Sequence, residues 1–383
     1  MQRWAIPLIL VCLFLLAGCA QNSEVKNPPA TPPQASVPSP SKEIPPAPQP
    51  PPRPAAPSAP VPPPAQNQSQ PQANISGQSN LSNLTNGSSL QNATPSAPAK
   101  PKIQKWVLEG GERLSEGVSP SPMRVGGKLV LYYTGMGGIF RAASDDGLNF
   151  GAPAKIFDFA SNSAIFHLSD GRYRMLYNPM LPPAPGQRHA TSQYFLSAVS
   201  SDGLNWQKED GVRFRSAGAP DYDTVSVPAV VDFGNNTLRM YFVGDMYAVD
   251  YERAGNNIRS AVSRDGGLSW AREPGESLPV LDAMDPAVMK VEGGYRLYYT
   301  SLVKPPPGQE MKEFTMNVYS AFSPDGLKFE PEGMVLAAPA AGQRLMDPEF
   351  IQSDNGSWRM YVSLATGEGQ NEQTRLVSAV PAS

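Results

Sequence analysis

The chain has 383 residues, with 31 Lys and Arg, 34 Asp and Glu, and a formal net charge of −3. This balance argues against a nucleic acid as partner, because such binding relies on clustered positive charge. The two cysteines, Cys12 and Cys19, both lie near the N-terminus. We therefore expect neither a disulfide nor thiol chemistry in the rest of the chain.

Residues 1–18 have the features of an export signal. Arg3 supplies a positive charge, and residues 6–16 form an apolar run that is too short to span a membrane comfortably. The sequence Leu16-Ala17-Gly18-Cys19 resembles the bacterial lipobox, which implies that Cys19 is lipidated and becomes the new N-terminus. An ordinary cleaved signal is the alternative.

The residue after the cysteine bears on localisation. Ala20 stands where an Asp would resemble an inner-membrane retention signal. We therefore expect an exported, lipid-anchored protein, in the outer membrane if the host is Gram-negative. Its folded part would lie in the periplasm or at the cell surface.

Residues 19–102 are predicted to be a disordered linker. From Gln21 to Lys102 the chain contains no Phe, Tyr or Trp, and a Pro-rich stretch gives way to one rich in Ser, Asn and Gln. Such a composition buries too little apolar surface to offset chain entropy, so we expect disorder or partial polyproline II. This linker separates the lipid anchor from a folded head, residues 103–383.

A short phrase, Ser-x-Asp-Gly followed shortly by Trp or Phe, recurs along the head. Asp is suited to accept hydrogen bonds from turn amides, and Gly supplies a positive φ. We expect the aromatic residue to pack between neighbouring repeats, which gives the phrase a structural role. The copies span residues 144–150, 200–206, 263–270 and 323–329, with Asp146, Asp202, Asp265 and Asp325.

A second phrase, a Gly or Asn turn followed by aliphatic and aromatic residues, precedes each of these turns. It is typical of the second strand of a hairpin. Repeats of about 40–60 residues that alternate strand and turn signals predict a propeller. We therefore predict an all-β, five-bladed β-propeller. The copies lie at residues 127–133, 171–177, 236–242, 294–299 and 356–362.

The last repeat lacks a fourth strand because the chain ends at Ser383. Residues 106–110 have the same pattern as residues 206–210 and 329–333, which follow the aromatic turn. We therefore expect the first strand of the head to pair into the last blade and close the ring. Closure would remove open sheet edges.

These phrases, together with inner strands that begin Asp-Pro, resemble the five-bladed β-propeller glycoside hydrolases of family 43 and of the invertase–levansucrase type. The resemblance covers the whole head. It implies three acids that project into a central funnel: a base or nucleophile Asp, an Asp that tunes pKa, and an acid Glu. Hydrolysis of a glycosidic bond needs two carboxylates across it, with one held protonated.

The position that begins each inner strand varies along the chain. Only repeats four and five keep Asp-Pro, and the acid expected two residues before Pro228 is Ser226. The family order of catalytic acids is therefore absent. In chain order the position is Ser119, Asn162, Val227, Asp285 and Asp347.

Asp285 and Asp347 are the first catalytic candidates, because equivalent places on adjacent blades bring their side chains to one mouth of the channel. A structural role is the alternative, in which Asp-Pro caps the strand and the pair holds water or a cation. Arg344, Asn162 and Ser119 are candidate substrate-binding residues. Candidates for a third acid are Glu116, Asp223, Asp282 and Glu349.

The sequence therefore predicts a monomeric, lipid-anchored propeller that engages carbohydrate or an envelope glycan, by binding or by glycosidic-bond hydrolysis. The different-class alternative is a non-catalytic module that holds a protein or an envelope polymer. No cofactor is expected apart from a structural cation in the central channel, and no His/Cys spacing suited to zinc is visible.

Overall fold

The computed structural model describes residues 101–180, 194–215, 225–244, 257–303, 314–353, 356–367 and 371–382. The regular elements in these ranges are all β-strands, and none of these ranges holds a helix long and apolar enough to cross a membrane. The predicted signal, Cys19 and nearly all of the linker lie outside the described residues.

The strands fall into repeats that match the sequence phrases. Repeat 1 contains β2 (Val118–Val125), β3 (Lys128–Gly135), β4 (Gly138–Ser144) and β5 (Ala154–Asp158). Repeat 2 contains β6 (Ala160–His167), β7 (Tyr173–Pro179), β8 (Tyr194–Ser200) and β9 (Gln207–Arg215). Repeat 3 contains β10 (Val225–Gly234), β11 (Thr237–Gly244), β12 (Asn257–Ser263) and β13 (Ala271–Arg272).

The last two repeats share a sheet with the first strand of the chain. Repeat 4 contains β14 (Met284–Val291), β15 (Gly294–Leu302), β16 (Met316–Ser323) and β17 (Glu330–Leu336). Repeat 5 contains β18 (Arg344–Gln352), β19 (Trp358–Thr366) and β20 (Gln373–Pro381), beside β1 (Trp106–Leu108). A single parallel bridge between Met316 and Arg344 joins the two repeats into one eight-stranded sheet.

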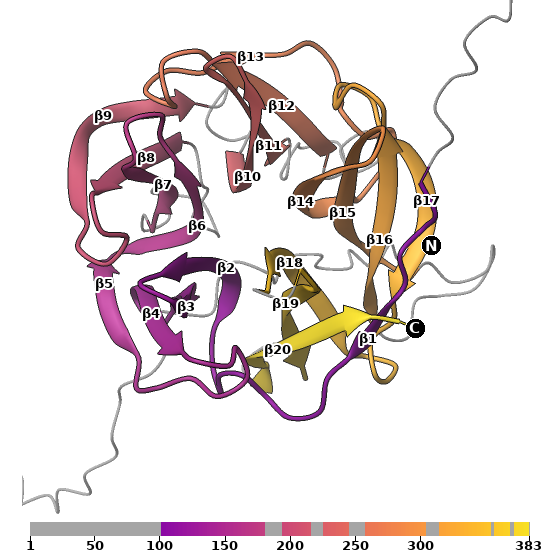
Figure 1. Ribbon diagram of the computed structural model, residues 1–383. Helices are drawn as coiled ribbons and strands as arrows, with labels where there is room; N and C mark the ends of the chain where they lie inside the picture. The colour runs from indigo at the N-terminus through magenta and orange to yellow at the C-terminus, as the bar shows by residue number, and fades with distance from the viewer. Residues whose placement is uncertain are drawn as a thin grey trace, which may run out of the picture. The chain divides into compact units, whose positions relative to one another are not determined.

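Repeats 1, 2 and 3 each form a separate four-stranded sheet of antiparallel neighbours. Figure 1 shows the sheets arranged around a common centre, with the first strand of every repeat, β2, β6, β10, β14 and β18, nearest to it. This arrangement confirms an all-β architecture of propeller type. It also brings the starts of five inner strands to one place.

The repeated turn is held by its Asp, as predicted. The Asp146 carboxylate accepts hydrogen bonds from the backbone N–H groups of Leu148 and Asn149, each at 2.8 Å, and from the Ser144 hydroxyl at 2.9 Å. These bonds hold the pKa of Asp146 below its usual range. Asp202, Asp265 and Asp325 accept equivalent bonds in the other turns.

In three of the four turns the aromatic residue at the end packs edge-on against a Tyr of the preceding repeat, and Trp106 on β1 makes the same contact; Trp270 of repeat 3 does not, because the equivalent residue of repeat 2 is Leu176. Such T-shaped pairs add roughly 0.5–1.5 kcal/mol each beyond area burial. The Tyr hydroxyl also donates to the carbonyl of the turn Gly, as from Tyr241 to Gly326 at 2.6 Å. The pairs are Trp206 on Tyr132, Phe329 on Tyr241, Phe150 on Tyr361 and Trp106 on Tyr298, with ring centroids 5.5 to 6.1 Å apart.

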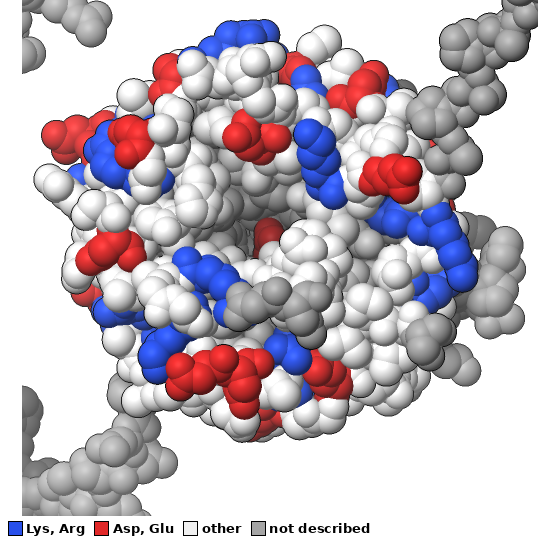
Figure 2. All heavy atoms as spheres, in the orientation of Figure 1, with Lys and Arg blue, Asp and Glu red and all other residues white. Residues whose placement is uncertain are grey.

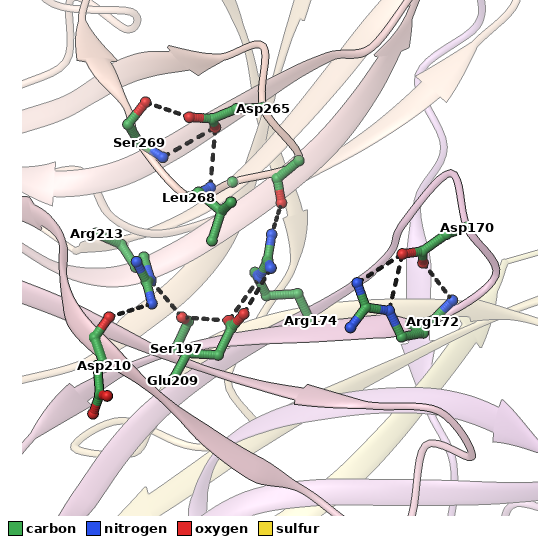
Figure 3. A network of polar contacts seen from close by, with 12 residues as sticks. Asp170, Arg172, Arg174, Ser197, Glu209, Asp210, Arg213, Asp265, Leu268 and Ser269 are labelled. Carbon is green, nitrogen blue, oxygen red and sulfur yellow. Dashed lines mark hydrogen bonds and ion pairs between the residues drawn. The ribbon is translucent and has the colours of Figure 1, made fainter.

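A second repeated contact joins the outer strand to the second strand. In repeat 2, Glu209 on β9 accepts two hydrogen bonds from Arg174 on β7, each at 2.8 Å, and one from the Ser197 hydroxyl (Figure 3). The carboxylate stands three residues after the turn aromatic, Trp206. Repeats 3 and 4 have the same ion pair, Arg239 with Glu273 and Arg296 with Glu332.

In repeat 5 the carboxylate comes from the other end of the chain. β1 pairs antiparallel with β20, from Trp106 opposite Pro381 to Leu108 opposite Ala379. Glu109, directly after β1, accepts from Arg359 at 2.8 Å and from the Ser378 hydroxyl at 2.6 Å. The predicted pairing of the first strand of the head with the last repeat is therefore present.

Replacing Glu109 with Ala removes this contact and leaves the largely buried Arg359 guanidinium without its carboxylate. We expect the free energy of unfolding in urea to fall by about 2–4 kcal/mol. Asp170→Ala is the matched control, because Asp170 and Arg172 form an ion pair with both side chains about half exposed. That control should lose less than about 1 kcal/mol. Equal losses would show that Glu109 contributes nothing beyond an exposed ion pair.

Candidate functional site

The starts of the five inner strands surround a narrow cavity at the common centre of the sheets. Figure 2 shows a hollow at this centre with an acidic side chain visible inside it. The cavity has room for about one water molecule. Its lining consists of Ser119, Pro120, Asn162, Ser163, Val227, Pro228, Asp285, Pro286, Asp347, Pro348 and Glu349.

One residue of each repeat in this lining has a left-handed backbone. We call the five residues Ser119, Asn162, Val227, Asp285 and Asp347 the collar. Their φ angles lie between 47° and 54°. Asn and Asp tolerate this region, whereas a β-branched residue such as Val227 is a genuine outlier there. Backbone strain of this kind persists only where the surroundings enforce it.

A bulge in every inner strand accompanies the left-handed residue. In repeat 5, for example, the pairing of β18 with β19 slips between Met346 and Glu349. The same slip occurs in β2, β6, β10 and β14 at the equivalent place. Bulges interrupt ladder bonding and redirect side chains. The collar residues therefore need hydrogen-bond partners from outside their own ladder.

The two Asp residues of the collar supply such partners for their neighbours. The Asp285 carboxylate accepts from the Thr300 hydroxyl at 2.6 Å and from the backbone N–H of Asp347 at 3.2 Å. The Asp347 carboxylate accepts from the Ser363 hydroxyl at 2.9 Å and from the backbone N–H of Ser119 at 3.0 Å. Each Asp thus links its own second strand to the collar of the next repeat.

The chain of bonds continues through repeats 1 and 2. The Ser119 hydroxyl donates to the Asn162 side-chain oxygen at 2.9 Å, and the Asn162 backbone N–H donates to the Thr134 hydroxyl at 2.9 Å. The Asn162 amide donates in turn to Asn178 at 3.3 Å. The backbone N–H groups of the collar residues in repeats 5, 1 and 2 therefore each donate to a side chain of the preceding repeat.

Sequence reasoning missed the second-strand residues that take part in this network. Thr134, Asn178, Thr300 and Ser363 each end the apolar and aromatic run of a second strand. The equivalent residue in repeat 3 is Val243, and the collar residue there is Val227. An alignment of the repeats would have shown that the collar residue and this second-strand residue are both polar in repeats 1, 2, 4 and 5 and both Val in repeat 3.

Burial shifts the acids at this site toward their protonated forms. Asp285 and Asp347 are only 3% and 5% exposed. Desolvation raises the pKa of both, and for Asp285 the charge of Asp347 adds to it. Glu349 is half-buried beside them, and desolvation raises its pKa to about 8, with a smaller contribution from Asp347.

The structure brings some of the candidate residues together and leaves others apart. Asp285, Asp347, Glu349, Ser119 and Asn162 all line the central cavity. Their place in the lining does not test what they do, so their catalytic or binding roles stay predictions.

The remaining candidates lie elsewhere. Arg344 forms a buried ion pair with Glu372 at 3.0 Å and donates to the Gly367 carbonyl at 2.9 Å. Glu116 is exposed before β2, and Asp282 precedes β14; neither belongs to the cavity lining. Asp223 lies outside the described residues.

Metal-ligating side chains do not gather within the part of the chain that the structure describes. Those ranges hold no group of three or more His, Cys, Asp or Glu side chains that could bind a metal ion. The structural cation expected in the channel stays a prediction.

The fold is similar to that of several solved glycoside hydrolases. An α-L-arabinanase of Cellvibrio cellulosa has a TM-score of 0.53 and 14% identity, covering 68% of this chain and 90% of its own. An endo-1,4-β-xylanase of Bacteroides thetaiotaomicron has a TM-score of 0.51 and 15% identity, covering 72% and 97%. An exo-1,5-α-L-arabinanase from a bovine ruminal metagenomic library has a TM-score of 0.53 and 11% identity, covering 72% and 100%.

These likenesses show the fold expected from the sequence, that of the family 43 propellers. A thermostable family-43 glycoside hydrolase matches as well, with a TM-score of 0.52 and 13% identity over 72% of this chain and 92% of its own. No protein-family model matches the sequence, and no curated protein does.

Glu349→Gln should flatten the pH dependence of stability. The folded chain retains the Glu349 proton to about pH 8, whereas an unfolded Glu titrates near 4.3. The contribution of the protonated Glu349 to the free energy of unfolding is therefore fully present below about pH 4. It is lost as the pH rises toward 8, by at most about 1.4 kcal/mol per pH unit. Urea unfolding at several pH values measures this.

Glu330→Gln provides the control, because Glu330 is an exposed carboxylate on β17. The control should follow the wild-type profile. A Glu349→Gln profile that also followed the wild type would show that Glu349 titrates as it does in the unfolded chain.

Proposed function

We propose that the head is a five-bladed propeller closed by β1, and that the mouth of its central channel binds a glycan without cleaving it. The pairing of β1 with β20 and the shared Arg359–Glu109 contact support the closure. The five collar residues, one in each repeat, support the number of blades.

The main support for binding without cleavage is the burial and hydrogen bonding of the two collar Asp residues, Asp285 and Asp347. Each carboxylate accepts one hydroxyl and one backbone N–H, and both side chains are buried. The cavity between them holds about one water molecule, whereas hydrolysis needs two carboxylates about 5–9.5 Å apart with a sugar between them. Asp285 and Asp347 are therefore better suited to holding the channel together than to reacting with a glycosidic bond.

The ligand class follows from the fold neighbours and the acids. Those neighbours are named as arabinanases and a xylanase, so arabinan and xylan are the first glycans to test. Glu349 is the collar-level acid that keeps some exposure, and a protonated carboxyl there could donate to a sugar hydroxyl.

Hydrolysis is the second candidate, favoured by the same residue. A Glu with its pKa raised to about 8 is protonated at neutral pH, as a general acid must be. In that case Glu349 would protonate the leaving oxygen, and Asp347 or Asp285 would be the partner carboxylate.

Isothermal titration with arabinan and xylan oligosaccharides, together with an assay of released reducing sugar, separates the two. We expect binding without product. Glu349→Ala removes the donating carboxyl and should weaken binding about fivefold, equivalent to about one neutral hydrogen bond, whereas Glu349→Gln keeps a donor and should bind nearly as the wild type does. Glu330→Gln should leave it unchanged. Product formed by the wild type and lost in Glu349→Gln and Asp347→Asn would identify a hydrolase instead, and no binding to any glycan would contradict both.

We also propose that the head is carried as a monomer on a lipidated Cys19, through a linker of residues 19–102. The support is the Leu16-Ala17-Gly18-Cys19 sequence after an apolar run, and the absence of aromatic residues up to Lys102. Lipidation would hold the head at a membrane while the linker lets it reach a glycan some distance away.

Metabolic labelling with a palmitate analogue tests the anchor. The wild-type chain should carry the label and sediment with membranes, whereas Cys19→Ser should carry none. Cys12→Ser is the matched control and should label normally, because Cys12 lies inside the apolar run. Label retained in Cys19→Ser would place the modification elsewhere.

A further inference from the structure

Three acids line the central cavity. Asp285 and Asp347 belong to the collar, and Glu349 stands two residues after Asp347 on β18. Glu349 therefore adds a third carboxyl to a cavity in which the collar already has two. An acidic side chain is visible in the hollow from outside, so a ligand can approach the acids from this face (Figure 2). The residues equivalent to Glu349 in the other repeats are all small: Ser121, Ala164, Ala229 and Ala287.

Within the described ranges, both collar Asp residues make their hydrogen bonds through a single carboxyl oxygen. The Thr300 hydroxyl and the Asp347 backbone N–H both donate to Oδ2 of Asp285. The Ser363 hydroxyl and the Ser119 backbone N–H both donate to Oδ2 of Asp347. Because both side chains line the cavity, each Oδ1 is left to accept from a donor that is placed there.

A buried hydroxyl in the same lining also lacks a partner. Ser163 follows the collar residue Asn162, at the place where the other four repeats have Pro. It is 7% exposed, and its Oγ makes no hydrogen bond within the part of the chain that the structure describes. A buried polar atom without a partner is destabilising, so an occupant of the cavity that bonds Ser163 removes a penalty.

The charge of this lining favours a cationic occupant. The described residues that form the lining include three acids and no Lys, Arg or His. Desolvation raises the pKa of Asp285, Asp347 and Glu349, whereas a cation beside them would lower it. Opposite charges attract each other much more strongly in a desolvated site than in water. A positively charged group in the cavity would therefore allow these carboxyls to ionise.

Size and geometry favour an ammonium group over a metal ion as that cation. The cavity has room for about one water molecule, and an –NH₃⁺ group is of similar size. The described acids form no group that could ligate a metal, which would need oxygens at about 2.0–2.6 Å. Ammonium donors bond carboxylates at about 2.7–2.9 Å instead. An ammonium group has three donors, and the cavity offers it three carboxyls.

We propose that the central cavity binds the protonated amino group of an unacetylated amino sugar, while the sugar ring stays outside at the mouth of the channel. This inference rests on the proposed function, that the mouth binds a glycan. The ammonium group donates to Oδ1 of Asp285 and Asp347 and to the Glu349 carboxyl, with the Ser163 hydroxyl as a further acceptor. Glu349 ionises when the ammonium group binds, and its proton passes to the solvent. An acetylated amino sugar lacks the charge and has a larger substituent, so the cavity rejects it.

Isothermal titration of the full chain with three oligosaccharides of equal length and linkage tests the cavity. Oligomers of glucosamine, N-acetylglucosamine and glucose differ only in the group on C2, which is an amine, an acetamide or a hydroxyl. At a pH where the sugar amine is largely protonated, we expect the glucosamine oligomer to bind at least tenfold more tightly than the other two. Its binding should also release a proton, measured as an enthalpy that varies with the ionisation enthalpy of the buffer. Trilysine serves as a comparison ligand that has amines but no sugar.

Two variants with the same chemical change make the assignment specific. Glu349→Gln removes one carboxyl from the cavity and keeps the shape of the side chain. It should raise the Kd of the glucosamine oligomer about tenfold and change that of the glucose oligomer less than twofold. Glu330→Gln removes an exposed carboxylate from β17 and should leave both Kd values unchanged. Asp285→Asn should act as Glu349→Gln does, and Glu349→Gln keeps the test valid if Asp285→Asn does not fold.

Several results would overturn the inference. Equal binding of the glucosamine and glucose oligomers would do so and would leave glycan binding at the mouth intact. Absence of binding by every glycan, arabinan and xylan included, would overturn this inference together with the proposed function. Equal shifts for Glu349→Gln and Glu330→Gln would indicate attraction to the general negative charge of the chain. Trilysine that binds as tightly as the glucosamine oligomer would identify a site for protein amines instead.

Discussion

The contact between consecutive repeats is the interaction on which the rest of the structure depends. Each sheet is small, and a four-stranded sheet with apolar residues on both faces is stable only when neighbours cover it. The turn aromatic of one repeat and the second-strand Tyr of the preceding one supply that cover, with the Tyr hydroxyl fixing the turn Gly, as in Tyr361 and Gly147. This contact recurs at four of the five junctions between repeats, and the collar lies where the inner strands of those repeats meet.

The collar shows how one backbone geometry can carry different chemistry. Five residues share a left-handed φ at a bulge, yet they include two acids, an amide, a hydroxyl and an aliphatic side chain. The acids fall in repeats 4 and 5, where each carboxylate accepts the backbone N–H of the next collar residue and a hydroxyl of its own second strand. Where Val227 replaces a polar residue, Val243 replaces its partner. The side chains in the channel thus vary in matched pairs, which is what a structural network requires.

The sequence was sufficient for an all-β architecture of propeller type because its signals are local and repeated. The Asp turns, the aromatic wedges and the pairing of residues 106–108 with the last strand all follow from phrases that can be compared within one chain. The state of the central acids was not predictable in the same way. The hydrogen bonds of Asp347 to Ser119 and Ser363 join residues far apart in sequence, and the cavity size depends on how five strands meet.

The pairing of β1 with β20 has a consequence for how the chain reaches its native state. Residues 106–108 leave the ribosome long before residues 379–381, so the first strand of the head has to wait for β20 before it finds its neighbour. Contacts of such large sequence separation form slowly. Until β20 has formed, β1 and β19 both present open edges, and unpaired edges are where partly folded chains associate. The formation of β20 therefore decides when the folding chain is protected from association with other copies.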